Sequence, residues 1–141
     1  MSHLDQELQR QHRERYSAQV EEIQVRLEDL LGREGVAGSM LIDAAGHAIA
    51  ASGDLSTQDP DLLVALSSAC YAALAQVFSA LGNGPVNHLN VSGIERGFSV
   101  QPVGRGTLLL VSWDVAFPAP ELDDLHGKLA PLLGLLEPER N

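Results

Sequence analysis

The stretch DPDLLVALSSACYAALAQVFSALG, residues 59–82, decides how this chain folds. Asp59 is a favourable N-cap, and Pro60 suits the first helical turn, where its missing N–H costs nothing. Gly82 supplies a stop, because glycine readily takes the left-handed conformation that ends a helix. The pattern therefore predicts a helix over residues 60–81.

At 100° per residue, the large apolar side chains of this predicted helix gather on one side, which we expect to face the core. They are Leu62, Leu63, Leu66, Cys70, Leu74, Val77, Phe78 and Leu81, with Tyr71 at the margin. The opposite side is small and uncharged, where an ordinary surface helix carries Lys, Glu or Arg. It consists of Ala65, Ser68, Ala72, Ala75, Gln76 and Ser79. This small face predicts close packing against a second protein surface, although an alanine-rich face is also compatible with plain solvated surface.

The predicted helix also has the length of a membrane span. Ala, Ser and Gln make it a weak apolar segment, and no Lys or Arg flanks it closely, so we expect no membrane insertion. Its one cysteine, Cys70, lies among Ala and Leu without a nearby base, which predicts a buried structural thiol.

Strands flank the helix on both sides. GSMLIDAAGHAIAASGD, residues 38–54, has the pattern of a β-hairpin, and its run of residues 40–42 is apolar on both faces, as in a central strand. After the helix, the alternation over residues 86–91 predicts a half-buried edge strand. Two further strands are predicted over residues 97–103 and 107–113, and the second of these is again apolar on both faces.

Helices are predicted at both ends of the chain, over residues 4–31 and 121–136. A core-facing stripe at helical spacing marks the first of them: Tyr16, Val20, Ile23, Leu27, Leu30 and Leu31. We divide the chain into an N-terminal helical extension (1–15), which projects into solvent or frays, a domain (16–136) and a tail (137–141).

The predicted order is therefore helix, hairpin, helix, three strands, helix. Two strands that are apolar on both faces need a layer on each side. We expect an α/β protein of the α+β type, in which a five-stranded antiparallel sheet lies between the central helix and the N- and C-terminal helices.

Composition limits the function. The chain has 141 residues, enough for one domain, and a net charge of −10 without a basic cluster, so we expect no nucleic-acid partner. A single cysteine fits a reducing compartment, and the polar N-terminus lacks the apolar segment of a secretory signal, so the expected location is cytoplasmic.

Catalytic and metal-binding patterns do not stand out. The five histidines are scattered without zinc-ligand spacing, and Asp43 is better explained as a turn residue that accepts backbone N–H bonds than as a partner of His47. No Walker A or G-x-S-x-G sequence occurs. We expect no enzyme, no metal and no cofactor.

Three segments in this order resemble the Roadblock family. They are GSMLIDAAGHAIAASGD (38–54), LVALSSACYAALAQVFSALG (63–82) and PVGRGTLLLVSWD (102–114), and the resemblance covers roughly residues 20–136. The family includes dynein light chains and bacterial MglB, which acts on the Ras-like GTPase MglA.

The resemblance implies a homodimer in which edge strands pair across a two-fold axis and the two central helices lie antiparallel. In MglB-like members these helices also form the docking surface for the GTPase. The implied partner and dimer interface comprises Ala65, Ser68, Ala72, Ala75, Gln76, Ser79, Val86, His88, Leu89, Asn90 and Val91.

Our leading hypothesis is a dimeric, non-enzymatic regulator of a small Ras-like GTPase, either a GTPase-activating protein or its partner. The alternative is a scaffold or adaptor subunit of a larger assembly, with no effect on GTP hydrolysis and with the N-terminal extension as its contact. A heterodimer with a second Roadblock protein stays open.

Overall fold

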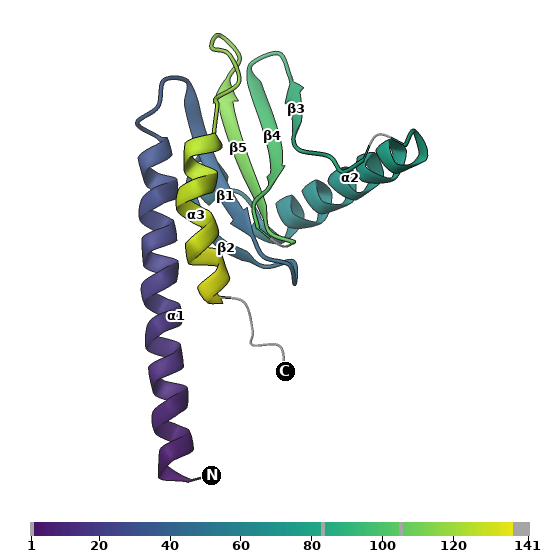
Figure 1. Ribbon diagram of the computed structural model, residues 1–141. Helices are drawn as coiled ribbons and strands as arrows, with labels where there is room; N and C mark the ends of the chain where they lie inside the picture. The colour runs from purple at the N-terminus through teal and green to yellow at the C-terminus, as the bar shows by residue number, and fades with distance from the viewer. Residues whose placement is uncertain (1, 83, 105, 137–141) are drawn as a thin grey trace.

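The computed structural model describes residues 2–82, 84–104 and 106–136 (Figure 1). In chain order the elements are α1 (His3–Leu30), β1 (Val36–Ile42), β2 (Ala48–Gly53), the 3-10 helix η1 (Asp54–Thr57), α2 (Pro60–Ala80), β3 (Leu89–Ser92), β4 (Arg96–Pro102), β5 (Leu108–Asp114) and α3 (Asp123–Leu136). The predicted order of elements is confirmed. The predicted tail, 137–141, lies outside the described residues.

The five strands form one antiparallel sheet in the order β2-β1-β5-β4-β3. The two strands predicted to be central, β1 and β5, lie side by side within the sheet. The predicted edge strand is an edge, but it occupies Leu89–Ser92 and so begins later than expected. Val86 precedes it as a buried residue of the connection.

Helices lie on both faces of the sheet, which confirms the expected α+β architecture (Figure 1). On one face, α1 and α3 pack against alternate residues of the central strands, such as Leu41 and Leu109. On the other face, the start of α2 packs against their neighbours in sequence, such as Met40 and Leu110. Period-two alternation therefore divides each central strand between two cores.

The β1–β2 turn is built as the sequence predicts. The carboxylate of Asp43 accepts hydrogen bonds from the N–H of Ala45 at 3.0 Å and of His47 at 2.9 Å. Gly46 has a φ of 85°, which glycine adopts without strain. Asp43 is thus a turn residue.

Helix α1 is longer than the sheet that it covers, and two residues of its predicted core stripe are exposed. Fully buried positions begin at Ile23, whereas Tyr16 and Leu31 are exposed, so their assignment to the core is wrong. The N-terminal part is helical from His3, and Ser2 caps it by accepting a bond from the N–H of Asp5 at 3.2 Å. The apolar residues of α1 keep helical spacing beyond the part of the helix that covers the sheet, so spacing alone overestimates how many of them are buried.

Candidate partner interface

Helix α2 is anchored at its N-terminal end and projects away from the sheet. The carboxylate of Asp59 caps it, accepting from the N–H of Asp61 at 3.1 Å and of Leu62 at 3.4 Å. Val64 and Ser67 are its buried residues. Beyond them the helix runs outward past β3, with its C-terminal half away from the body of the molecule (Figure 1).

The face of α2 turned towards the sheet is a narrow stripe. It comprises Leu63, Val64, Ser67, Ser68, Tyr71, Leu74, Ala75 and Phe78, all buried or half-buried. The hydroxyl of Tyr71 donates to the carbonyl of Val86 at 2.9 Å, just before β3. This bond ties the middle of α2 to the edge of the sheet, so residues beyond it extend past that edge.

The expected core-facing side of α2 is wrong for five of its eight members. Four large apolar residues on it are between 49% and 73% exposed: Leu62, Leu66, Val77 and Leu81. Cys70, predicted to be a buried thiol, is exposed between them. The helix is apolar almost all round, so periodicity has little power to choose which side faces the core.

The predicted interface residues fall into two groups. Those that lie on the surface are Ala65, Ala72, Gln76, Ser79, His88, Asn90 and Val91. Ser68, Ala75 and Leu89 are half-buried, and Val86 is buried. The structure thus brings the outward side of α2 and the strand β3 to the same end of the sheet, but the large residues Leu62, Leu66, Val77 and Leu81 replace Ser68 and Ala75 as its outward members.

The edge of the sheet at β3 is open. Within the described ranges, β3 pairs with β4 on one side, and no other strand or loop backbone bonds to its outer side. At the opposite edge, the Gln24 amide donates to the carbonyl of Ala51 at 2.7 Å, and its oxygen accepts from the Ala51 N–H at 3.3 Å. Gln24 therefore satisfies the outer backbone groups of Ala51 at the β2 edge, and no side chain of residues 2–82, 84–104 or 106–136 does so at β3.

The surface around β3 continues the apolar character of α2. Leu89 and Phe98 pack at the margin of the core on the α2 side, and Val91, opposite Phe98, is 52% exposed there. An apolar face beside an open strand edge is suited to binding another protein chain. Among the described residues no three His, Cys, Asp or Glu side chains gather as metal ligands would.

By length and composition alone, α2 would also suffice to cross a membrane, with little of it buried inside the chain. Helices of soluble proteins can have the same length and apolar composition, so these two properties are weak evidence for a membrane span. Val64 packs in the core at the start of this helix, and the Tyr71 bond to Val86 fixes its middle to the connection that leads into β3.

The chain was compared with known protein families, curated protein sequences and solved structures, and it matches one domain family. The model of the Roadblock/LC7 domain matches residues 21–112. A comparison with curated protein sequences finds no match.

Solved structures agree with this match. MglB of Myxococcus xanthus is 17% identical, with 86% of this chain and 95% of that chain covered, at a TM-score of 0.76. The gliding protein MglB of Thermus thermophilus is 27% identical, with 84% and 90% covered, at 0.64. A Roadblock/LC7 domain from Streptomyces avermitilis is 21% identical, with 79% and 91% covered, at 0.60.

Proposed function

The chain belongs to the Roadblock/LC7 domain family, and from this premise we propose that it is a dimeric, non-enzymatic regulator of a small Ras-like GTPase in the cytoplasm. One observation carries the proposal: the uncharged, apolar side of α2 is exposed next to the open edge of β3. Surfaces of this kind are stable in water when another protein covers them.

A second copy of the chain is the natural first partner. Each copy has an outer half of α2 that carries the exposed residues Val77 and Leu81, and a half-covered apolar surface at Leu89, Val91 and Phe98. If two β3 strands pair antiparallel about a two-fold axis, the outer half of each α2 comes to lie over the sheet of the other copy. Each copy then supplies what the other lacks.

The paired helices would offer the GTPase a broad surface without charge. No Lys or Arg occurs on α2, so the helix has no arginine to insert beside the γ-phosphate. Arg96, at the start of β4, lies 3.5 Å from the carboxylate of Asp54, and Arg105 lies outside the described residues. Any acceleration of hydrolysis would therefore come from the GTPase's own switch loops, reshaped by contact.

The dimer is tested first by size. We expect the wild-type chain to run as a dimer in size-exclusion chromatography with light scattering, and Leu66→Asp to shift it to monomer. A charge placed in a desolvated interface costs on the order of 2–4 kcal/mol, which is roughly a 30- to 1,000-fold loss of affinity. Val25→Asp is the matched control, because Val25 is also an exposed apolar residue, on α1. Unchanged dimerisation of Leu66→Asp would contradict the proposal.

Cys70 gives an independent test of how the helices meet. It is the one cysteine of the chain and lies halfway along α2, close to where antiparallel helices would cross. We expect a short bis-maleimide to link two copies through Cys70, and Cys70→Ser to abolish the linked product. A dimer that forms without such a link would meet through another surface.

GTPase regulation is tested by affinity capture from the source cell's lysate, with GDP or a non-hydrolysable GTP analogue. Retention of a small GTPase with the analogue alone, and faster single-turnover hydrolysis of GTP, is the expected result. A nucleotide-independent set of partners would instead favour the second candidate, a scaffold subunit. The exposed N-terminal part of α1 is the observation in favour of that candidate.

A further inference from the structure

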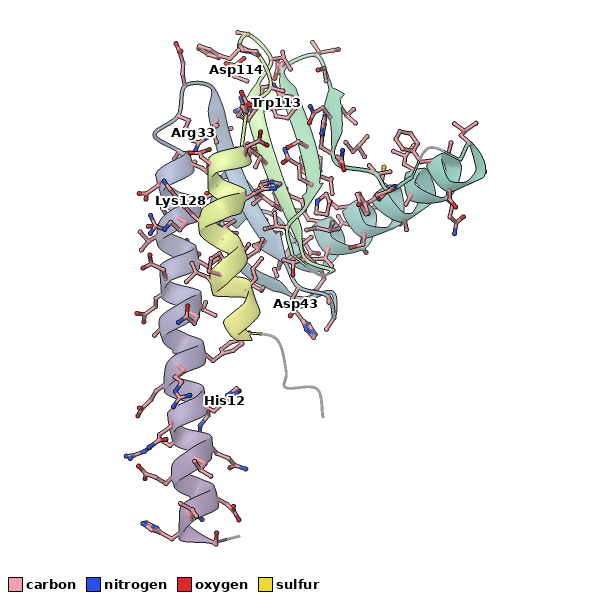
Figure 2. The ribbon with its side chains drawn as sticks, in the orientation of Figure 1. His12, Arg33, Asp43, Trp113, Asp114 and Lys128 are labelled. Atoms are coloured by element: carbon pink, nitrogen blue, oxygen red, sulfur yellow. The ribbon has the colours of Figure 1, made fainter. Side chains whose placement is uncertain are left out.

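The N-terminal part of α1, residues 3–18, extends beyond the body of the molecule, and we call it the arm. Figure 1 shows that α3 lies beside the later part of α1 only, and Figure 2 shows His12 on the stretch beyond the end of α3. The arm is helical throughout, and Ser2 caps its free end. It therefore presents a helical surface about 24 Å long that is largely exposed.

One side of the arm carries a row of side chains spaced by four residues, which we call the arm ridge: Leu4, Leu8, His12 and Tyr16. Residues four apart lie one above another on a helix, so these side chains form a continuous strip. The three large apolar members of the strip are between 43% and 65% exposed. A contiguous exposed apolar strip is typical of a face that binds protein.

The charged residues beside the arm ridge are divided by sign along the helix. Asp5 and Arg13 each directly follow a ridge residue, which places both on one flank. Glu7 and Arg15 each directly precede a ridge residue, which places both on the other flank. Each flank thus has a carboxylate towards the N-terminal end and a guanidinium towards the C-terminal end. Glu7 also pairs with Arg10 of its own helix, on the side away from the ridge.

We propose that the arm ridge binds the arm of a second copy of this chain, packed antiparallel about a two-fold axis. Such an axis sets each flank against the same flank of the other copy with its direction reversed. Asp5 then faces Arg13 of the second copy on one flank, and Glu7 faces Arg15 of the second copy on the other. A partner helix with charges of one sign would meet like charge at one end of the arm, and a parallel copy would meet it at both ends.

The same antiparallel register brings the two ridges together. Leu8 lies opposite His12 of the second copy, near the two-fold axis, and Leu4 lies opposite Tyr16 of the second copy, towards each end of the contact. The leucines of each arm therefore pack on the rings of the other, which removes exposed apolar surface from water. The proposal is independent of α2 and of GTPase binding, and the two contacts together would link dimers into larger assemblies.

Sedimentation velocity of the full-length protein, at concentrations up to about 1 mM, tests this contact, because a contact this short is smaller than a standard interface and associates weakly. The Leu66→Asp protein, with a charge on α2, isolates the arm contact. We expect reversible association to persist in Leu66→Asp and to be abolished when Leu8→Asp is added. Leu8→Asp alone should keep the assembly that depends on α2. If Leu8→Asp leaves the association of the Leu66→Asp protein unchanged, or if no association occurs to be lost, the arm proposal fails while the α2 dimer is judged separately.

Two double variants in the Leu66→Asp protein test the charge pattern. Asp5→Arg with Glu7→Arg makes both flanks basic, and Arg13→Glu with Arg15→Glu makes both flanks acidic. We expect each variant alone to associate roughly tenfold more weakly than the protein without these changes, because like charges then face each other. An equal mixture of the two variants should regain the association, because every facing pair is then opposite in sign.

Glu14→Lys is the matched control, because Glu14 lies on the far side of the helix from the ridge, and it should leave association unchanged. Circular dichroism of each variant shows that the arm stays helical. A loss that mixing does not restore, or double variants that associate as well alone as together, would overturn the antiparallel pairing.

Discussion

The two faces of the sheet, each with its neighbouring edge strand, differ in how completely the chain covers them. The side under α1 and α3, with the edge β2, is closed: its core residues are almost fully buried, and Gln24 caps the edge. The side under α2, with the edge β3, is open: large apolar residues are exposed, and the edge has no cap within the described chain. The difference separates the surface that one chain can bury by itself from the surface that it leaves for a partner.

We expect the largest difference between the two sides when a leucine on each side is replaced by alanine. Leu27 is fully buried on the closed side, and Leu66 is 61% exposed on the open side. We expect Leu27→Ala to lower the free energy of unfolding by about 2–5 kcal/mol at every protein concentration, because it leaves a cavity. Leu66→Ala should weaken only the part of the stability that rises with protein concentration, since that part reflects dimerisation.

Urea unfolding followed at several protein concentrations measures both effects. A concentration-independent loss for Leu66→Ala as large as that for Leu27→Ala would mean that the open side is part of the core of a single chain. The comparison between the sides would then fail.

Removing the cap tests the difference between the edges. Gln24→Leu leaves the N–H and C=O of Ala51 without their partner, and we expect a loss of roughly 1–3 kcal/mol in the free energy of unfolding. With both edges open, species larger than a dimer should also increase in light scattering. Gln6→Leu makes the same change at an exposed position of α1, on the side away from Leu8, and should alter neither measurement. If Gln24→Leu behaves like Gln6→Leu, the amide is not a cap.

The smallest expected effect concerns the ion pair at the end of the closed side. Arg33, just after α1, lies 2.6 Å from the carboxylate of Asp124 at the start of α3, and also donates to the carbonyl of Glu121 at 2.6 Å. The hydrogen bond from Arg33 holds the pKa of Asp124 below its usual value. A lowered pKa in the folded state contributes stability above the unfolded-state pKa, and this contribution is lost as pH falls through the folded value.

We therefore expect Asp124→Asn to lower the thermal midpoint slightly at pH 7, because the pair is exposed and screened by solvent. The difference from wild type should disappear in acid, once Asp124 is protonated. A difference that persisted unchanged to strongly acidic pH would show that the pair is not its cause.

Much of the fold was predictable from local patterns. The cap at Asp59, the turn at Asp43 and the doubly apolar runs of β1 and β5 each depend on neighbours in sequence, and each was found as expected. The candidate site was less predictable. The absence of charge and the family resemblance were enough to predict that the site involves α2 and β3. They were not enough to predict which side of α2 faces outward, because apolar residues occur almost all round the helix.

Sequence alone thus determined the elements, their order, the layered architecture and the presence, in an acidic chain, of a helix that has no charged residue after Asp61. Tertiary structure decided which residues of α2 face the sheet, which residues of α1 are buried, and which edge strand has its outer backbone groups bonded by a side chain. These depend on where each helix ends relative to the sheet and on contacts between distant residues, such as Gln24 with Ala51 and Tyr71 with Val86. Periodicity reports that a helix has an apolar side, but the length of the surface beneath it determines how much of that side is buried.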